Sequence, residues 1–307
     1  MPIWVETTIR APLEEVWRRT QDPALHAQWD LRFSAIDYLP RTDESEPQRF
    51  LYRTRIGFGL QIRGEGESRG EREAGGARTS ALRFWSDDGK SLIREGSGYW
   101  KYVPVPEGVR FLTVYDYTTR FGVLGKALDR AVCRPLMAWA TAWSFDRLRR
   151  WCERGTPPVV AARQALARAT ARLALALVWI YQGLVPKLLF PEMGELATVR
   201  AAVGARAPAV LLVIALAELG YGLALLLAWR SRLLPALAIP GLLVLFGAGV
   251  RADPAMLTTP FNTPTLTVAT MALAAVDLLL LRDVPSSAGC RWSSRKGRAE
   301  RAASAGR

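Results

Sequence analysis

Two charged residues in apolar surroundings carry the strongest chemical information in this sequence of 307 residues. Lys187 lies in the run LVWIYQGLVPKLLFPEMGEL, and Glu218 lies in the run AVLLVIALAELGYGLALLLAW. A charge inside a bilayer is costly, so it normally faces the interior of a helix bundle and finds a partner there. We therefore predict an intramembrane polar cluster formed by Gln182, Lys187 and Glu218.

The depths of these residues in a bilayer agree with such a cluster. If the two runs are antiparallel helices, the backbones of Lys187 and Glu218 differ in depth by roughly 9 Å at a rise of 1.5 Å per residue. Helical side chains lean toward the N-terminus of their own helix, so each of the two points toward the level of the other. Ala215 and Gly222 supply small residues for close helix packing. The alternatives are a Lys187 that extends to the headgroups and a Glu218 with a purely structural role.

A second set of titratable groups lies in the more polar first half of the chain. General acid–base chemistry needs a titratable group that faces a cavity, and the candidates are His26, Glu95 and Asp116. The simpler interpretation is a partly exposed helix position for His26 and the solvated face of a strand for the two acids. A single histidine and three widely spaced cysteines provide no metal site and no disulfide framework, and no cofactor is expected.

Aromatic residues of the same half are candidates for lining a ligand cavity. They are equally compatible with an ordinary aromatic core, because both arrangements have the same composition. The predicted ligand-binding residues are Trp29, Trp85, Trp100, Tyr115 and Tyr117.

The elements that position these residues follow from the hydrophobic patterns. WVETTIRAP predicts a strand, and LEEVWRRTQ and DPALHAQWD predict two short helices. About six alternating segments follow with short turns between them, which indicates a curved antiparallel sheet. GEGESRG resembles a phosphate loop only superficially and is interpreted as a strand with a bulge. Residues 121–153 predict a long helix with a kink or restart at Pro135.

The stretch TIRAPLEEVWRRTQDPALHAQWD resembles the opening of the START-like, or polyketide cyclase (SRPBCC), superfamily. This resemblance implies an α+β helix-grip fold over residues 1–153, with a hydrophobic cavity between a curved antiparallel sheet and a long C-terminal helix. It does not imply a particular reaction, because the superfamily includes carriers, cyclases and hydrolases.

Four apolar runs make the second half an all-α bundle of four transmembrane helices. The runs cover residues 169–190, 209–229, 233–250 and 264–282, each close to the roughly 20 residues that cross a bilayer. We expect a basic linker at 154–168, a membrane domain at 169–283 and a disordered basic tail at 284–307. Near the inner end of the last run, Asp277 is expected to pair locally with Arg282 or to be hydrated.

The charge distribution gives an orientation and argues against nucleic acid as a partner. The net charge is +13, but the arginines flank the apolar runs and fill the tail. This placement fits the positive-inside rule and predicts an inner-membrane protein with both termini in the cytoplasm. The first residues also lack the pattern of a secretory signal.

The run at the start of the membrane half resembles the DoxX-like membrane family. The later AELGYG and TTPFNTPTLTV extend the resemblance over about residues 169–283. No haem motif, cysteine pair or flavin fingerprint is present, so a redox role is not transferred. The matching residues of the first run are Trp179, Tyr181, Gln182, Gly183, Pro186, Lys187 and Glu195.

The sequence therefore predicts a membrane protein whose cytoplasmic START-like domain binds a hydrophobic or amphipathic small molecule near the bilayer. Two alternatives remain open. One is an enzyme, either cyclase- or hydrolase-like in the soluble cavity or linked to quinone in the membrane. The other is a membrane scaffold without a ligand.

Overall fold

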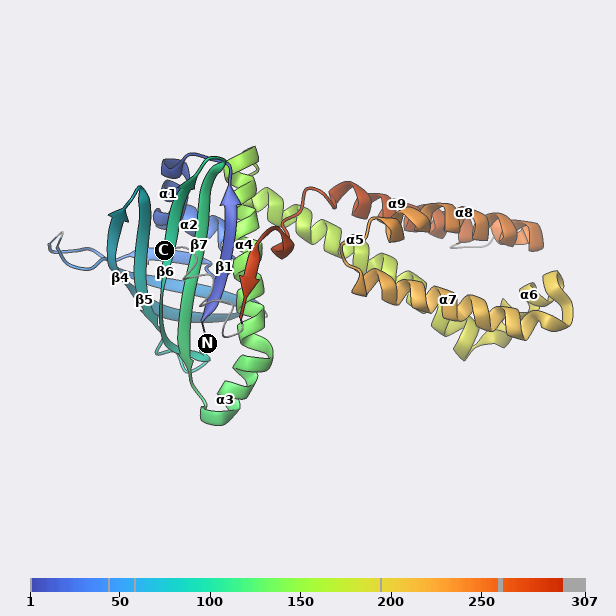
Figure 1. The fold of residues 1–307 in the computed structure, drawn as a ribbon. Helices are drawn as coiled ribbons and strands as arrows, with labels where there is room; N and C mark the ends of the chain where they lie inside the picture. Colours follow the sequence, from blue (N-terminus) through green and yellow to red (C-terminus); the bar gives the residue numbers. More distant parts are fainter. Residues whose placement is uncertain (1, 44, 58, 194, 259–261, 295–307) are drawn as a thin grey trace. The chain divides into compact units, whose positions relative to one another are not determined.

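The structure is a computed structural model that describes the whole chain except residues 1, 44, 58, 194, 259–261 and 295–307 (Figure 1). It divides into two compact units, which are described separately. Unit 1 contains residues 1–161 and the segment that begins at Pro285, and unit 2 contains Ala162–Val284.

Unit 1 is built on an eight-stranded antiparallel sheet with the strand order β2-β3-β4-β5-β6-β7-β1-β8. The strands are β1 (Ile3–Ile9), β2 (Ala35–Tyr38), β3 (Arg49–Gly57), β4 (Leu60–Ala74), β5 (Ala77–Trp85), β6 (Ile93–Val105), β7 (Gly108–Thr119) and β8 (Arg291–Ser293). The helices are α1 (Leu13–Gln21), α2 (Pro23–Trp29), α3 (Gly122–Leu128), the π-helical η1 (Asp129–Cys133) and α4 (Arg134–Arg154).

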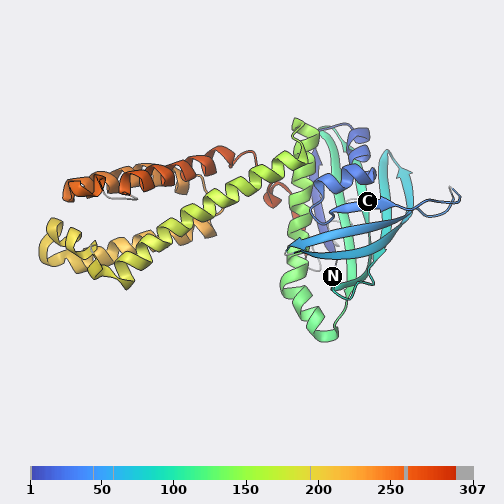
Figure 2. The same cartoon turned by 180° about the vertical axis from the view of Figure 1, so that it is seen from behind.

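The predicted helix-grip fold is confirmed by this architecture. The sheet curves, and α4 runs along it, as both views show (Figures 1 and 2). Alternate residues of β6 and β7 face α4, and Phe111 of β7 stacks on Phe145 of α4 with ring centroids 4.4 Å apart. Ala138, Ala142, Phe145 and Leu148 of α4 belong to the same buried cluster, at the spacing of one helix face.

Glycines on the sheet allow aromatic residues of neighbouring strands to approach the backbone closely. A Cβ on Gly66 would lie 2.3 Å from Cζ of Phe50, and a Cβ on Gly98 would lie 2.4 Å from Cβ of Tyr115. These close approaches require glycine, because no other residue lacks the Cβ. The cross-strand pairs are Phe50–Gly66, Tyr52–Gly64, Phe84–Gly96 and Tyr115–Gly98.

Two local predictions for unit 1 agree with the structure. The GEGESRG segment lies in β4, where the register shifts between Ser68 and Gly70 and Gly70 adopts φ 107°. Pro135 lies in the first turn of α4, directly after π-helical η1. The helical backbone is continuous through this junction, where Arg134 N–H donates to the Asp129 carbonyl, and the widened π-helical turn accommodates the N–H that proline lacks.

The expected disordered tail is wrong for residues 285–294. Ser287–Gly289 form the short 3₁₀ helix η6, and β8 pairs antiparallel with β1. The backbone N–H of Ser286 donates to the Asp146 carboxylate at 2.8 Å, and the Cys290 thiol lies 3.2 Å from the carbonyl of Ala142. Burial raises the pKa of the Cys290 thiol to about 12. The remainder of the predicted tail, residues 295–307, lies outside the described residues.

Unit 2 contains four helices that are long and apolar enough to cross a membrane, as predicted. They are α5 (Pro158–Leu184) with the π-helical η2 (Val185–Leu189), α7 (Ala207–Leu227), α8 (Leu233–Ala252) and α9 (Thr263–Leu280). The short helices are η3 (Pro191–Met193), α6 (Glu195–Val203), η4 (Gly204–Arg206) and η5 (Pro254–Leu257). The expected linker at 154–168 differs, because α5 begins at Pro158 and continues without interruption.

Candidate functional site

A buried polar constellation lies among the aromatic side chains of unit 1. Asp30, fully buried, accepts hydrogen bonds from Arg32 Nε at 2.9 Å and Arg32 Nη2 at 2.6 Å. His26 Nε2 lies 3.1 Å from Asp30 Oδ2, and the Arg32 guanidinium lies 5.2 Å from the centre of the Tyr115 ring. The Tyr115 hydroxyl in turn lies 2.9 Å from Oγ1 of Thr141. We call His26, Asp30, Arg32 and Tyr115 the interior polar cluster.

Charges within this cluster stabilise one another. Burial alone would raise the pKa of the Asp30 carboxyl, but the Arg32 guanidinium and the hydrogen bonds from His26 and Arg32 hold it well below its usual range. Burial lowers the pKa of His26 and outweighs the opposing effect of Asp30, so the imidazole is neutral at pH 7. The neutral ring then donates from Nε2 to the ionised Asp30.

Helix α2 places the first two members of the cluster. Asp22 caps this helix, because its Oδ1 accepts hydrogen bonds from the backbone N–H groups of Ala24 and Leu25. Within α2 and its C-cap, His26 and Asp30 are four residues apart and therefore share one face. The prediction of a partly exposed His26 is wrong, since this face packs against Trp100 with ring centroids 4.9 Å apart.

Four of the five predicted ligand-binding aromatics lie together in the interior. Trp29, Trp100, Tyr115 and Tyr117 all belong to the main buried cluster of unit 1. Trp85 differs, because its position in β5 directs the ring to the opposite face of the sheet, where the guanidinium groups of Arg83 and Arg49 lie about 6 Å from it. Successive residues of a strand point to opposite faces of the sheet.

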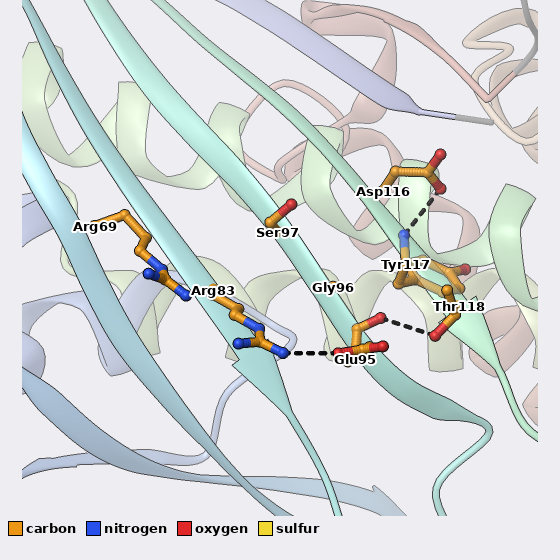
Figure 3. Close-up of a pocket in the computed structure, with 8 residues that line it drawn as sticks. All are labelled: Arg69, Arg83, Glu95, Gly96, Ser97, Asp116, Tyr117 and Thr118. Atoms are coloured by element: carbon orange, nitrogen blue, oxygen red, sulfur yellow. Dashed lines mark hydrogen bonds and ion pairs between the residues drawn. The ribbon is translucent and has the colours of Figure 1, made fainter.

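The acids Glu95 and Asp116 occupy that outer face and do not point into the interior. Glu95 pairs with Arg83 at 2.9 Å, and Asp116 pairs with Arg134 at 2.8 Å. They border a shallow, charged hollow of about 530 Å³ (Figure 3). The residues that line it are Arg69, Arg83, Glu95, Gly96, Ser97, Asp116, Tyr117 and Thr118. Among the described residues, no group of three or more His, Cys, Asp or Glu side chains has the geometry of a metal site.

In unit 2, the structure brings Lys187 and Glu218 together. Lys187 Nζ lies 3.0 Å from Glu218 Oε2 and 3.7 Å from Glu195 Oε1, and it donates to the backbone carbonyl of Gln182 at 3.2 Å. Both side chains of the close pair are more than 90% buried. Gln182 therefore contributes its carbonyl where a side-chain role was predicted, and Glu195 is an additional member.

Proline and glycine make this geometry possible. The Gln182 carbonyl would normally accept from the N–H four residues later, but that residue is Pro186, which has none. The carbonyl is thus available to the Lys187 ammonium in the widened π-helical turn of η2. Gly183 lies so close to α7 that a Cβ would be 2.6 Å from the Ala215 carbonyl oxygen, and a Cβ on Gly222 would be 2.6 Å from Cγ1 of Ile180.

A second buried ionic cluster in unit 2 was not predicted. Asp277 pairs with Arg172 at 2.6 Å and with Arg168 at 2.9 Å, and all three are buried, so the expected local pairing with Arg282 is wrong. Arg172 also donates to the carbonyls of Leu225 and Ala228 at the end of α7. The spacing of four residues between the two arginines places them on one helix face and was the available signal.

Comparisons with known proteins found a matching family model, a relative in sequence and solved structures of low identity. A model of the DoxX-like family matches residues 176–275. The uncharacterized membrane protein YndG of Bacillus subtilis (strain 168) is 48% identical over 184 residues, which cover 59% of this chain and 68% of YndG. This chain belongs to the YndG family.

The matched DoxX-like region of this YndG-family chain contains Gln182, Lys187 and Glu218, and Asp277 lies two residues beyond its end. Solved structures similar to unit 1 have low sequence identity. A STAR-related lipid transfer protein of Xanthomonas axonopodis is 20% identical with a TM-score of 0.36, covering 47% of this chain and 81% of its own. The Zhui aromatase/cyclase of Streptomyces sp. R1128 is 14% identical with a TM-score of 0.38, covering 51% of this chain and 98% of its own.

Proposed function

We propose that unit 1 binds a hydrophobic or amphipathic small molecule between its sheet and α4, and that unit 2 holds it at the cell inner membrane. The observation that carries this proposal is the interior polar cluster, which lies among the rings of Trp29, Trp100 and Phe33. Small-molecule sites in proteins are lined mainly by apolar and aromatic groups, with a few convergent polar groups that fix orientation.

The energetics of the cluster support a recognition role. Burying an aspartate and an arginine costs free energy that their pairing only partly returns, and an apolar replacement of similar volume is often equally stable. A core that serves packing alone has no need of such a pair. The arginine and tyrosine instead supply hydrogen-bond donors in an apolar setting, which suits a ligand with an apolar body and a carbonyl or hydroxyl group.

The membrane orientation in this proposal follows from the flanking cations. Arg163, Arg230 and Arg232 lie next to the inner ends of the first three spans. The two opposite loops are less basic, because Glu192, Glu195 and Asp253 offset Arg200, Arg206 and Arg251. Basic residues concentrate on the cytoplasmic side of membrane proteins. Unit 1 would therefore take its ligand from the cytoplasm or from the inner leaflet.

Native mass spectrometry of the full chain, released from nanodiscs, tests this proposal. We expect a bound apolar or amphipathic molecule that stays with the protein and is lost when Tyr115 and Arg32 are replaced by Phe and Met. The matched control is Arg83→Gln on the outer face of the sheet. A chain that never carries or takes up such a molecule would refute the binding role.

The pairing of His26 with Asp30 favours an enzyme as a second candidate. A neutral imidazole oriented by a carboxylate is a typical general base. If the protein is a carrier, neither the natural protein nor the His26→Gln variant converts the bound molecule. In an enzyme, His26→Gln would abolish conversion of the bound molecule while leaving its binding largely intact.

A further inference from the structure

The segment from α3 to the start of α4 presents an apolar surface to the outside of unit 1, which we call the apolar ridge. Val123 and Leu124 are 85% and 80% exposed, and the least exposed member is 39% exposed. Contiguous apolar surfaces of this kind mark sites of interaction with proteins or membranes. The ridge consists of Phe121, Val123, Leu124, Leu128, Val132, Leu136 and Trp139.

The pattern of the ridge is the reverse of an ordinary surface helix. On a soluble domain, the outward face of such a helix carries polar residues. From Leu124 to Trp139 the outward face repeats large apolar residues at intervals of three or four positions. The inward face carries buried Gly125, Asp129 and Ala138. Both views show α3 where the chain leaves β7, at one end of the sheet (Figures 1 and 2).

An ionic anchor holds the ridge in this orientation. Asp129 accepts hydrogen bonds from the Tyr117 hydroxyl at 2.7 Å and from Arg134 Nε at 2.8 Å on the inward side of η1. Phe121 has a positive φ of 64°, which costs a non-glycine residue free energy. The apolar side chains therefore cannot turn inward without breaking a buried ion pair.

We propose that the apolar ridge docks on the surface of an anionic lipid bilayer. In residues 120–139 the only acidic residue is Asp129, which is buried, whereas Lys126 and Arg130 are exposed beside the ridge. An apolar face flanked by exposed cations is the composition of interfacial helices, in which headgroup attraction adds to apolar burial. Unit 2 keeps a bilayer permanently available, so a weak second contact is sufficient. This docking goes beyond ligand binding and stands whether or not unit 1 holds a ligand.

Lipid quenching of a fluorophore on the full chain tests the docking. Leu124→Cys is labelled with an environment-sensitive dye, after Cys133, Cys152 and Cys290 are replaced by alanine and the melting profile is shown to be retained. The nanodiscs contain phosphatidylglycerol and lipids with nitroxide-bearing chains. Glu73→Cys, on the β4–β5 hairpin with a side chain that is 63% exposed, is the matched control.

Docking predicts a quenching constant at residue 124 at least about threefold above that at residue 73, as expected for burial at the headgroup boundary. The double substitution Lys126→Glu and Arg130→Glu should remove this difference without changing the melting profile. Equal quenching at both positions would overturn the proposal. So would a dye at residue 124 that is shielded from water but not quenched by lipid, because the ridge would then be covered by unit 2 or by a second copy.

Discussion

Lys187 and Glu218 stabilise unit 2 only as a pair. Each side chain is more than 90% buried, and their charged atoms are 3.0 Å apart. In an apolar environment, removal of one partner leaves an uncompensated charge, which is more destabilising than removal of both. The two residues are therefore expected to be energetically coupled, with Glu195 as a weaker and more exposed partner.

A double-substitution cycle measures this coupling. We predict that Lys187→Met lowers the stability of the protein by about 3 kcal/mol, because Glu218 is left without its cation. The combined Lys187→Met and Glu218→Gln variant should recover most of that loss. Thermal unfolding in detergent provides the measurement. A fully stable Lys187→Met variant would show that the pair is dispensable for the fold.

The pH dependence of stability should report on His26. Because burial lowers its pKa in the folded protein, the unfolded chain binds more protons than the folded protein at mildly acidic pH. The contribution of His26 to the free energy of unfolding is therefore fully present above the pKa of the unfolded chain, about 6.5, and is lost as the pH falls below that value. We expect the melting temperature of unit 1 to drop on acidification from pH 7.5 to pH 5.5 by an amount that His26→Gln reduces, with these pH values chosen to bracket about 6.5. An identical drop in that variant would contradict the assignment.

Some of these contacts are predictable from the sequence, and others are not, because they depend on tertiary packing. Lys187 and Glu218 could be paired in advance because helix rise and side-chain direction fix their depths. Trp100, which packs on His26, and the two arginines that pair with Asp277 lie on other elements, so these contacts depend on how helices and strands pack. The spacing of four residues between His26 and Asp30 was an available local signal. Trp85 was misplaced because the bulge and register of the sheet decide which face each position occupies, and one residue of error reverses the face.

At the scale of elements, the sheet depends on glycines that lie beneath aromatic rings. Gly64, Gly66 and Gly96 each face an aromatic residue directly across an antiparallel pair, and its ring fills the space that a side chain would take. Covering of strand glycines by cross-strand aromatics is a known device for fixing register. The composition of GEGESRG indicated a strand with a bulge, but the sequence did not show which ring covers which glycine.

Gly66→Ala is a direct test of this arrangement. The added methyl group would lie 2.3 Å from the Phe50 ring, and we predict a loss of about 1–3 kcal/mol as the ring is displaced. Gly89→Ala is the matched control, since nothing lies within 4 Å of its added Cβ. Thermal unfolding of the two variants should separate them clearly. Equal melting temperatures would show that the sheet accommodates the methyl group.

Strand β8 is the second element on which unit 1 depends. It covers the edge of β1, and Trp292 within it and Cys290 directly before it pack against the core. A chain that ends at Val284 would expose this edge, and we predict a lower melting temperature and concentration-dependent aggregation. A chain that ends at Ser294 is the control, and equal behaviour of both truncations would argue against a role for β8. A three-residue strand in a basic, serine-rich segment has no periodicity from which to predict it.

At the scale of the whole molecule, the chain leaves unit 1 at α5, crosses four apolar helices and returns to unit 1 at Pro285. The main division into a helix-grip domain and a four-helix membrane domain was predictable, because hydropathy and alternation differ strongly between the halves. The exact boundaries were not, since α5 replaces the expected linker and β8 replaces the start of the expected tail. Unit 1 is therefore connected at two points of the chain to helices that are apolar enough to cross a membrane.

The central claim is that the interior of unit 1 holds an apolar or amphipathic ligand oriented by Arg32 and Tyr115. Photo-crosslinking of the full chain in nanodiscs with a photoactivatable acyl probe, followed by mass spectrometry of the labelled peptides, tests it most directly. We predict saturable labelling of β6, β7 and α4, reduced about tenfold by Tyr115→Phe through loss of one hydrogen-bonding group and unchanged by Arg83→Gln. Labelling confined to unit 2, or labelling of unit 1 that is insensitive to Tyr115→Phe, would contradict the claim.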